Sequence, residues 1–212
     1  GRMRENKNYR LILMVLLSCC LQGTGRAAET IQAPSVPMTV LICYAGGPVQ
    51  SPDAEPATAS MLRVVEESGG WSPGSMTGLF ISDVKECGMH LDEQKPPFAI
   101  TTLGTFLTYH EKLGLIPLAQ PLIEGSSVER YRIMVRKGTY ASLEALTGKT
   151  VGGALVDEIE LLKRVVLRGA VDPESFFTLK SSQRVLHCLR SVANGELDAV
   201  IVNAQQYRAI GS

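Results

Sequence analysis

The sequence predicts an α/β fold with two lobes, each built on a parallel or mixed β-sheet. Short runs of apolar residues predict strands that are covered on both faces, and helix-spaced segments that end at glycine lie between them. Strands that alternate with helices form parallel βαβ units. The 212 residues suffice for one large domain or two small ones.

The first lobe is expected over residues 38–125. Its predicted strands are 38–44, 76–81 and 98–102. A helix capped by Asp53 and ended by Gly69 follows the first strand, and a helix capped by Thr105 continues to Leu113. The stretch between the second and third strands, up to Pro97, is expected to be rich in loops.

The second lobe is expected over residues 130–203, and 204–212 begin a return toward the first lobe. Its predicted strands are 131–136, 150–156, 176–179 and 198–203. Asp157 is expected to cap a helix over 158–168, and a second helix covers 183–193. Ligands of such sheets lie at the carboxyl ends of strands, near helix N-termini.

Residues 1–28 have the layout of a secretory signal peptide. A basic stretch precedes the apolar run Leu11–Leu21, which is too short to span a bilayer, and small residues follow up to Ala28. The segment around Cys19 and Cys20 also resembles a lipoprotein cleavage box, so a lipid anchor is the alternative to simple cleavage. We therefore expect a periplasmic protein that contacts the membrane only through such an anchor.

The remaining composition argues against several function classes. Five basic residues fall within 1–28, so the rest of the chain is mildly acidic and does not favour nucleic acid. No C-x-x-C or closely spaced histidine pair indicates zinc, so no metal or cofactor is expected. Cys43, Cys87 and Cys188 are interpreted as small buried apolar residues, with a Cys43–Cys87 disulfide as the alternative.

Enzymatic motifs are also missing from the sequence. Thr147–Thr150 mimics the end of a phosphate-binding P-loop, but Leu143 stands where its first glycine belongs and the motif precedes a strand. No serine lies in a G-x-S-x-G turn, and the carboxylates form no obvious acid/base pair. We expect a protein that is not an enzyme.

Three segments of the second half, Tyr131–Gly138, Ser142–Val151 and Ala193–Val200, resemble the second lobe of type II periplasmic binding proteins, closest to the phosphate/phosphonate-binding branch. Phe98–Leu107 and Ile116–Pro121 resemble the end of that family's first lobe, so the likeness covers about 38–203. The resemblance implies a monomer that binds a small molecule between two hinged lobes. It also implies delivery of that molecule to an ABC-type permease.

Two features depart from the family pattern. Val156-Asp157-Glu158 stands where the family usually offers hydroxyl residues for an oxyanion, and carboxylates there repel phosphate. The chain ends at Ser212, where the family adds further helices, so a truncated member is expected. The ligand is therefore predicted only as a small oxyanion, carboxylate or amine, and a periplasmic sensing module with the same fold is the alternative function.

The candidate ligand-binding residues lie at the ends of predicted strands. Each has an ordinary structural alternative: a helix cap or strand end at 101–105 and 181–182, a core tyrosine at 44, a cap at 157 and a turn at 203. Asp157 could instead bind an amine of the ligand. The complete set is Tyr44, Thr101, Thr102, Gly104, Thr105, Asp157, Ser181, Ser182 and Asn203.

Overall fold

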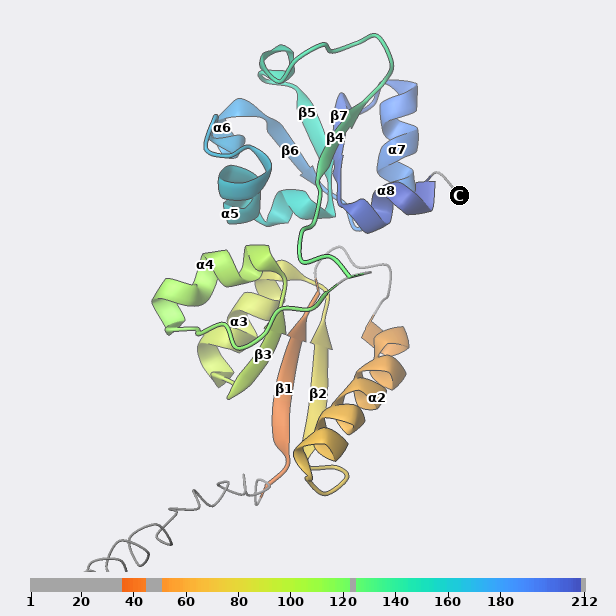
Figure 1. The fold of residues 1–212 in the computed structure, drawn as a ribbon. Coiled ribbons are helices and arrows are strands. Elements are labelled where there is room, and N and C mark those ends of the chain that lie inside the picture. Colours follow the sequence, from red (N-terminus) through yellow and green to blue (C-terminus); the bar gives the residue numbers. More distant parts are fainter. Residues whose placement is uncertain (1–35, 45–50, 123–124, 211–212) are drawn as a thin grey trace, which may run out of the picture. The chain divides into compact units, whose positions relative to one another are not determined.

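The computed structural model describes residues 36–44, 51–122 and 125–210, which belong to one compact unit. Its first sheet is parallel, with the order β2-β1-β3 (Figure 1). The strands of this sheet are β1 (Met38–Cys43), β2 (Met76–Ile81) and β3 (Phe98–Thr101). The helices are α2 (Ser51–Gly69), α3 (Val84–Gln94) and α4 (Leu103–Leu113). The predicted α/β architecture is confirmed.

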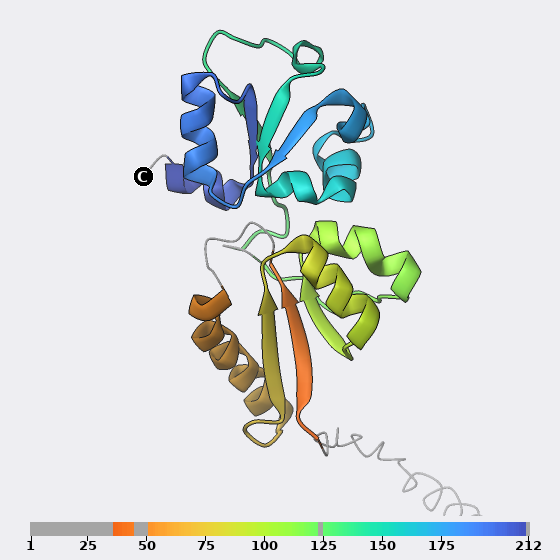
Figure 2. The same ribbon diagram turned by 180° about the vertical axis from the view of Figure 1, so that it is seen from behind.

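Helices cover both faces of this sheet, as the continuous apolar strands predict. Alternate residues of β1 point to opposite sides: Leu41 and Cys43 pack toward α3 and α4, whereas Val40 and Ile42 pack against Leu62 of α2. Figures 1 and 2 show α2 on one side of the strands and the α3–α4 pair on the other. The carboxyl end of β3 leads through Thr102 directly into the N-terminus of α4.

The stretch before β3 was expected to be rich in loops, and this prediction is wrong. It contains α3, which begins where the Asp83 carboxylate accepts the amide of Glu86 at 2.8 Å. The helix is short and mostly polar, and it has a glycine, Gly88, near its middle, so its apolar periodicity is weak. Only Cys87, Gly88 and Leu91 are buried along it.

The first sheet carries a disulfide between Cys43, at the end of β1, and Cys87 in α3. Their Cα atoms lie 5.8 Å apart, and both residues belong to the core on that face of the sheet. The interpretation of both as free, buried thiols is thus wrong, and the alternative pairing holds. The unexpected α3 is the cause, because it places Cys87 beside the end of β1. Cys188 is free and buried.

The second sheet has the order β4-β7-β5-β6, with β4 antiparallel to β7 and the other pairs parallel. Its strands are β4 (Arg132–Val135), β5 (Thr150–Gly153), β6 (Thr178–Ser181) and β7 (Ala199–Val202). The accompanying helices are the 3₁₀ turn η1 (Glu144–Leu146), α6 (Pro173–Phe176), α7 (Val185–Asn194) and α8 (Ala204–Ile210). This sheet is mixed, as expected.

The helix expected over 158–168 is present in a shorter form. The α-helical turn α5 (Ile159–Leu161) continues directly into the π-helical η3 (Leu162–Val166), and the 3₁₀ turn η2 (Ala154–Asp157) precedes them. Glu158 lies between η2 and α5 with φ −95° and ψ 70°, outside the helical region, so the helix cannot begin earlier. Asp157 is the last residue of η2, and the N-cap of α5 is Glu158, so the prediction of Asp157 as the helix cap is wrong.

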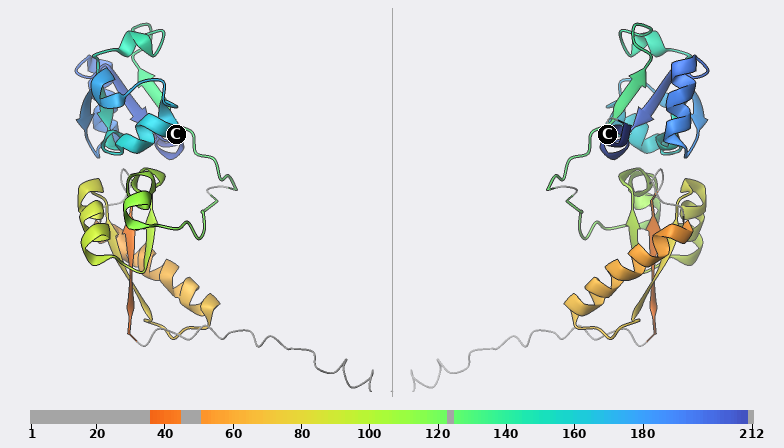
Figure 3. Two further views of the ribbon diagram at one scale, coloured as in Figure 1. Left: turned by 90° about the vertical axis from the view of Figure 1, so that its left-hand side faces the viewer. Right: turned by 90° about the vertical axis from the view of Figure 1, so that its right-hand side faces the viewer.

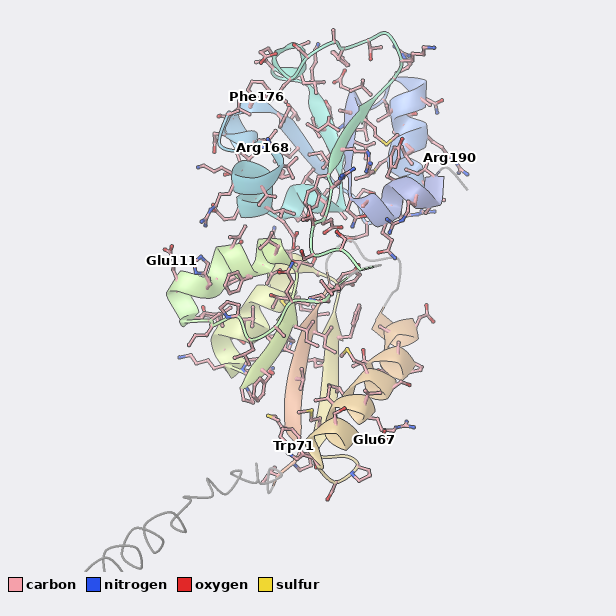
Figure 4. All side chains as sticks on the ribbon, viewed as in Figure 1. Glu67, Trp71, Glu111, Arg168, Phe176 and Arg190 are labelled. Carbon is pink, nitrogen blue, oxygen red and sulfur yellow. A yellow bond between two sulfur atoms is a disulfide. The ribbon has the colours of Figure 1, made fainter. Side chains whose placement is uncertain are left out.

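The second sheet also packs on both faces. Cys188 and Val192 of α7 cover Val200 and Val202 on one side. Leu161 and Leu162 pack with Val151 and Ile201 on the other. Phe176, labelled in Figure 4, meets Phe177 edge to face at 4.9 Å between ring centroids and adds to this second cluster. The cluster that contains Leu161 holds the adjacent turn at Glu158 against this face of the sheet.

The segment between α4 and β4 has no helix or extended strand among its described residues (Figure 3). The predicted signal segment 1–28, with Cys19 and Cys20, lies outside the described residues. Across the described part of the chain, none of the helices has the length and apolar character that a membrane crossing needs.

Candidate ligand-binding site

The N-terminus of α4 forms the centre of the candidate site. Thr102 is the N-cap, with φ −65° and ψ 161°, and its Oγ1 accepts the amide of Thr105 at 3.2 Å. Thr102, and not Thr105 as expected, therefore caps the helix. The first turn of any helix carries amides without intrahelical partners and the positive end of the helix dipole, so this turn suits an anion.

The anion that lies at this helix end is Glu158, a residue far away in the sequence. Its carboxylate accepts a hydrogen bond from the Thr102 hydroxyl and lies 3.5 Å from the Thr105 hydroxyl. The residue is only 2% exposed. Thr102, Gly104 and Thr105, three of the predicted site residues, are thus brought together around a carboxylate of the chain itself.

Gly104 makes the approach of Glu158 possible. A Cβ atom at position 104 would lie 2.5 Å from Cδ and 2.6 Å from Oε2 of Glu158, far closer than real contacts. A residue with a side chain would therefore push the carboxylate away from the end of α4. The glycine serves close packing here, since its φ is not in the left-handed region.

Burial raises the pKa of the Glu158 carboxyl above its usual value. Hydrogen bonds from Thr102 and from the Thr105 hydroxyl and amide act in the opposite direction, and the nearby charge of Glu129 raises the pKa further. The desolvation effect is the largest. The helix end therefore offsets only part of the cost of burying this charge.

Glu129 and Tyr131 lie close to Glu158, and Tyr44 lies close to Glu129 and Tyr131. Burial, and then the charge of Glu129, raises the pKa of both Tyr44 and Tyr131, and Glu158 adds to the effect on Tyr131. The Tyr131 hydroxyl donates to Glu129 at 3.0 Å, and the Tyr44 hydroxyl donates to Gln205 of α8 at 3.2 Å. Both phenols stay neutral at physiological pH and present aromatic faces and hydroxyls.

The predicted residues of the second half fall into a separate group. The Ser181 hydroxyl, at the end of β6, donates to the Asp157 carboxylate. Ser182 accepts the Arg184 amide at 3.3 Å and shapes the loop before α7. Asn203 caps α8, since its Oδ1 accepts the Gln206 amide at 2.8 Å. Thr101, half-buried in β3, pairs in register with Cys43 of β1.

Sequence reasoning missed the roles of Glu129, Tyr131 and Gln205, and it interpreted Glu158 as a first-turn carboxylate of its own helix that would repel phosphate. Glu129 and Tyr131 precede β4 in a segment without regular structure, where no periodicity marks them. The glycine at 104 was the one available signal, because it permits close approach at a helix N-terminus. Groups of acidic, histidine and cysteine residues suited to a metal ion are missing from the described parts of the chain.

Comparisons with known proteins identify the fold and the family. The family model for ABC-transporter phosphonate periplasmic substrate-binding proteins matches residues 48–211. No curated protein sequence matches the chain significantly. Among solved structures, the binding-protein component of an ABC phosphonate transporter from Pseudomonas aeruginosa is similar, with 15% identity and a TM-score of 0.54. The match covers 82% of this chain and 60% of that one.

The GluR0 ligand-binding core from Nostoc punctiforme, solved with L-glutamate, is also similar. It shares 18% identity over 81% of this chain and 71% of that chain, with a TM-score of 0.51. At such identities these two structures support the two-lobed α/β fold. The family assignment depends on the family model, which matches most of the sequence and confirms the predicted resemblance. The chain therefore belongs to the family of periplasmic substrate-binding proteins of phosphonate ABC transporters.

Proposed function

We propose that this protein captures a small polar solute in the periplasm, between the lobes at 38–125 and 130–203, and delivers it unchanged to an ABC permease. Membership of the substrate-binding family supports this role. The clustering of Thr102, Gly104 and Thr105 at one helix N-terminus supports the position of the site. A Tyr44 hydroxyl that reaches α8 adds a contact between distant parts of the chain.

We further propose that the solute carries a positively charged amino group. This proposal rests on the observation that Glu129 and Glu158 are both close enough to Tyr131 to raise its pKa. Two carboxylates near each other repel, and a bound ammonium relieves that repulsion. The aromatic faces of Tyr44 and Tyr131 also attract cations. A bare phosphonate brings the opposite charge and gains nothing from these groups.

Isothermal titration calorimetry of the purified protein against a panel of solutes tests the ligand class. The panel contains amino acids, polyamines, choline and 2-aminoethylphosphonate on one side, and methylphosphonate and inorganic phosphate on the other. We expect the protein to bind a compound of the first set, whose members carry a positively charged nitrogen. Glu129→Gln should weaken that binding by roughly tenfold, the effect of ~1.4 kcal/mol of lost charge attraction.

The matched control is Glu111→Gln on α4, where the side chain is exposed and points away from the helix (Figure 4). It removes the same charge and should leave binding unchanged. Binding of methylphosphonate in preference to every amine would contradict the proposed ligand class. Binding of no solute in the panel would count against the receptor role itself.

We also propose that residues 1–28 direct export and are removed after Ala27 or Ala28. The basic, apolar and small-residue parts of this segment support the proposal. Mass spectrometry of the protein recovered from the periplasm should give a mature N-terminus at position 28 or 29. An acylated N-terminal Cys19 or Cys20 in the membrane fraction would replace this proposal with the lipid-anchored form.

A further inference from the structure

The Glu158 carboxylate occupies the position at the end of α4 that an anionic ligand group would need. It comes from the turn between η2 and α5, and it accepts hydrogen bonds from residues that cap and open α4. Its 2% exposure shows that this position is closed to solvent. The helix end is therefore already satisfied by a negative charge that belongs to the chain.

We propose that Glu158 is a specificity-determining residue, which excludes free oxyanions from the α4 N-terminus by holding its own carboxylate there. An anion that entered would have to displace Glu158, or lie against it at hydrogen-bonding distance from the same two threonines. Like charges at such a separation repel strongly where water is excluded. The inference rests on the solute-receptor role proposed above, and it predicts that this member of a phosphonate-binding family does not bind a bare phosphonate.

Gly104 supports this role independently of the hydrogen bonds. A side chain at 104 would collide with the carboxyl group, Cδ being 2.5 Å from the Cβ position, and with Glu158 Cβ at 2.7 Å. The two residues are therefore matched in shape as well as in charge. Thr102 and Thr105 supply the donors, and Gly104 supplies the space for the carboxylate.

The test is binding of inorganic phosphate and of methylphosphonate to wild type, Glu158→Ala and Glu158→Gln, measured by calorimetry at neutral pH. Wild type should bind neither probe. Glu158→Ala removes both the charge and the bulk, and its affinity for at least one probe should exceed that of wild type by at least about tenfold. Glu158→Gln removes the charge alone and should show a smaller gain.

The matched control is Glu160→Ala. Glu160 lies two residues away in α5, where it pairs with Arg164 at 4.0 Å. It carries the same charge on the same segment, and its removal should leave the affinity for phosphate as in wild type. An equal gain in Glu160→Ala would show a general effect of net charge and overturn the proposal.

Two further results would also overturn it. The first is tight phosphate or methylphosphonate binding by wild type, which needs no variant to be folded. The second is a folded Glu158→Gln, verified by a cooperative melt, that binds both probes no better than wild type. Failure to find an amine ligand for wild type would refute the proposed ligand class and leave this measurement unaffected, because its probes are oxyanions.

Discussion

Reduction of the Cys43–Cys87 disulfide should destabilise the protein strongly. The two residues are 44 positions apart in the sequence. Closing a loop of this length removes enough conformational entropy from the unfolded chain to be worth ~4 kcal/mol at 25 °C in the chain-entropy account. Both sulfurs are buried in the core beside Leu41 and Leu91, so reduction changes little in packing. For a chain of this size, the loss corresponds to roughly 8–16 °C in melting temperature.

Urea unfolding followed by circular dichroism, with and without a thiol reductant, measures this loss. The double variant Cys43→Ala/Cys87→Ala should match the reduced wild type and should not respond to reductant. It retains the free Cys188, so it also controls for effects of the reductant on that thiol. Equal unfolding midpoints for oxidised and reduced wild type would refute the reasoning, because the link would then constrain nothing in the unfolded chain.

Three further perturbations follow from single carboxylates. The pKa of Glu158 is raised, so the folded protein binds a proton at this carboxyl more tightly than the unfolded chain does. The free energy of unfolding should therefore rise as the pH falls from the raised pKa toward about 4.5. In urea melts, Glu158→Gln should lack this rise. The pKa of Asp198 is lowered, chiefly by the hydrogen bond from the Tyr140 hydroxyl. The stabilisation that ionised Asp198 gives the folded protein should therefore hold above pH 3.8 and disappear as the pH falls below it. Asp198→Asn should show a smaller loss of stability in this acid range. Glu66 is buried and accepts the backbone amides of Gly74, in the loop before β2, and of Met76, the first residue of β2. Glu66→Ala should therefore lose about 2 kcal/mol in chemical denaturation, whereas Glu67→Ala next to it should lose almost nothing.

The strands could be predicted from the sequence because burial on both faces requires an uninterrupted run of apolar residues. The run from Val40 to Cys43 is apolar without interruption, and so is Ala199 to Val202. Helices with a clear apolar stripe, such as α7, could be predicted equally well. In contrast, α3 is polar along most of its length and buries only a few side chains. A helix that is stabilised mainly by its N-cap and a disulfide shows little of the apolar periodicity that predicts a helix from sequence.

The shortened helix after β5 shows a second limit of the sequence. Helical spacing from Glu158 to Arg168 is real, and Leu161 and Leu162 do pack in the core. However, the side chain of Glu158 binds at α4, and its backbone lies outside the helical region. The helix therefore begins at Ile159, one residue later than predicted, and the residue just before it contacts a helix far away in the sequence.

The candidate site shows why a binding motif in one segment does not identify its ligand. Thr102, Gly104 and Thr105 at a helix N-terminus predict a position for an anion, and an anion does lie there. The same pattern fits an anion from solution or one from the chain, because the hydroxyls and amides respond only to negative charge. Only the fold shows that Glu158 supplies it. In the proposed function, the remaining groups, Glu129 and the tyrosines, then select the solute, and their charge and aromatic faces favour a cation. Under the proposal made above, Glu158 therefore takes the place of an anionic ligand group at the end of α4.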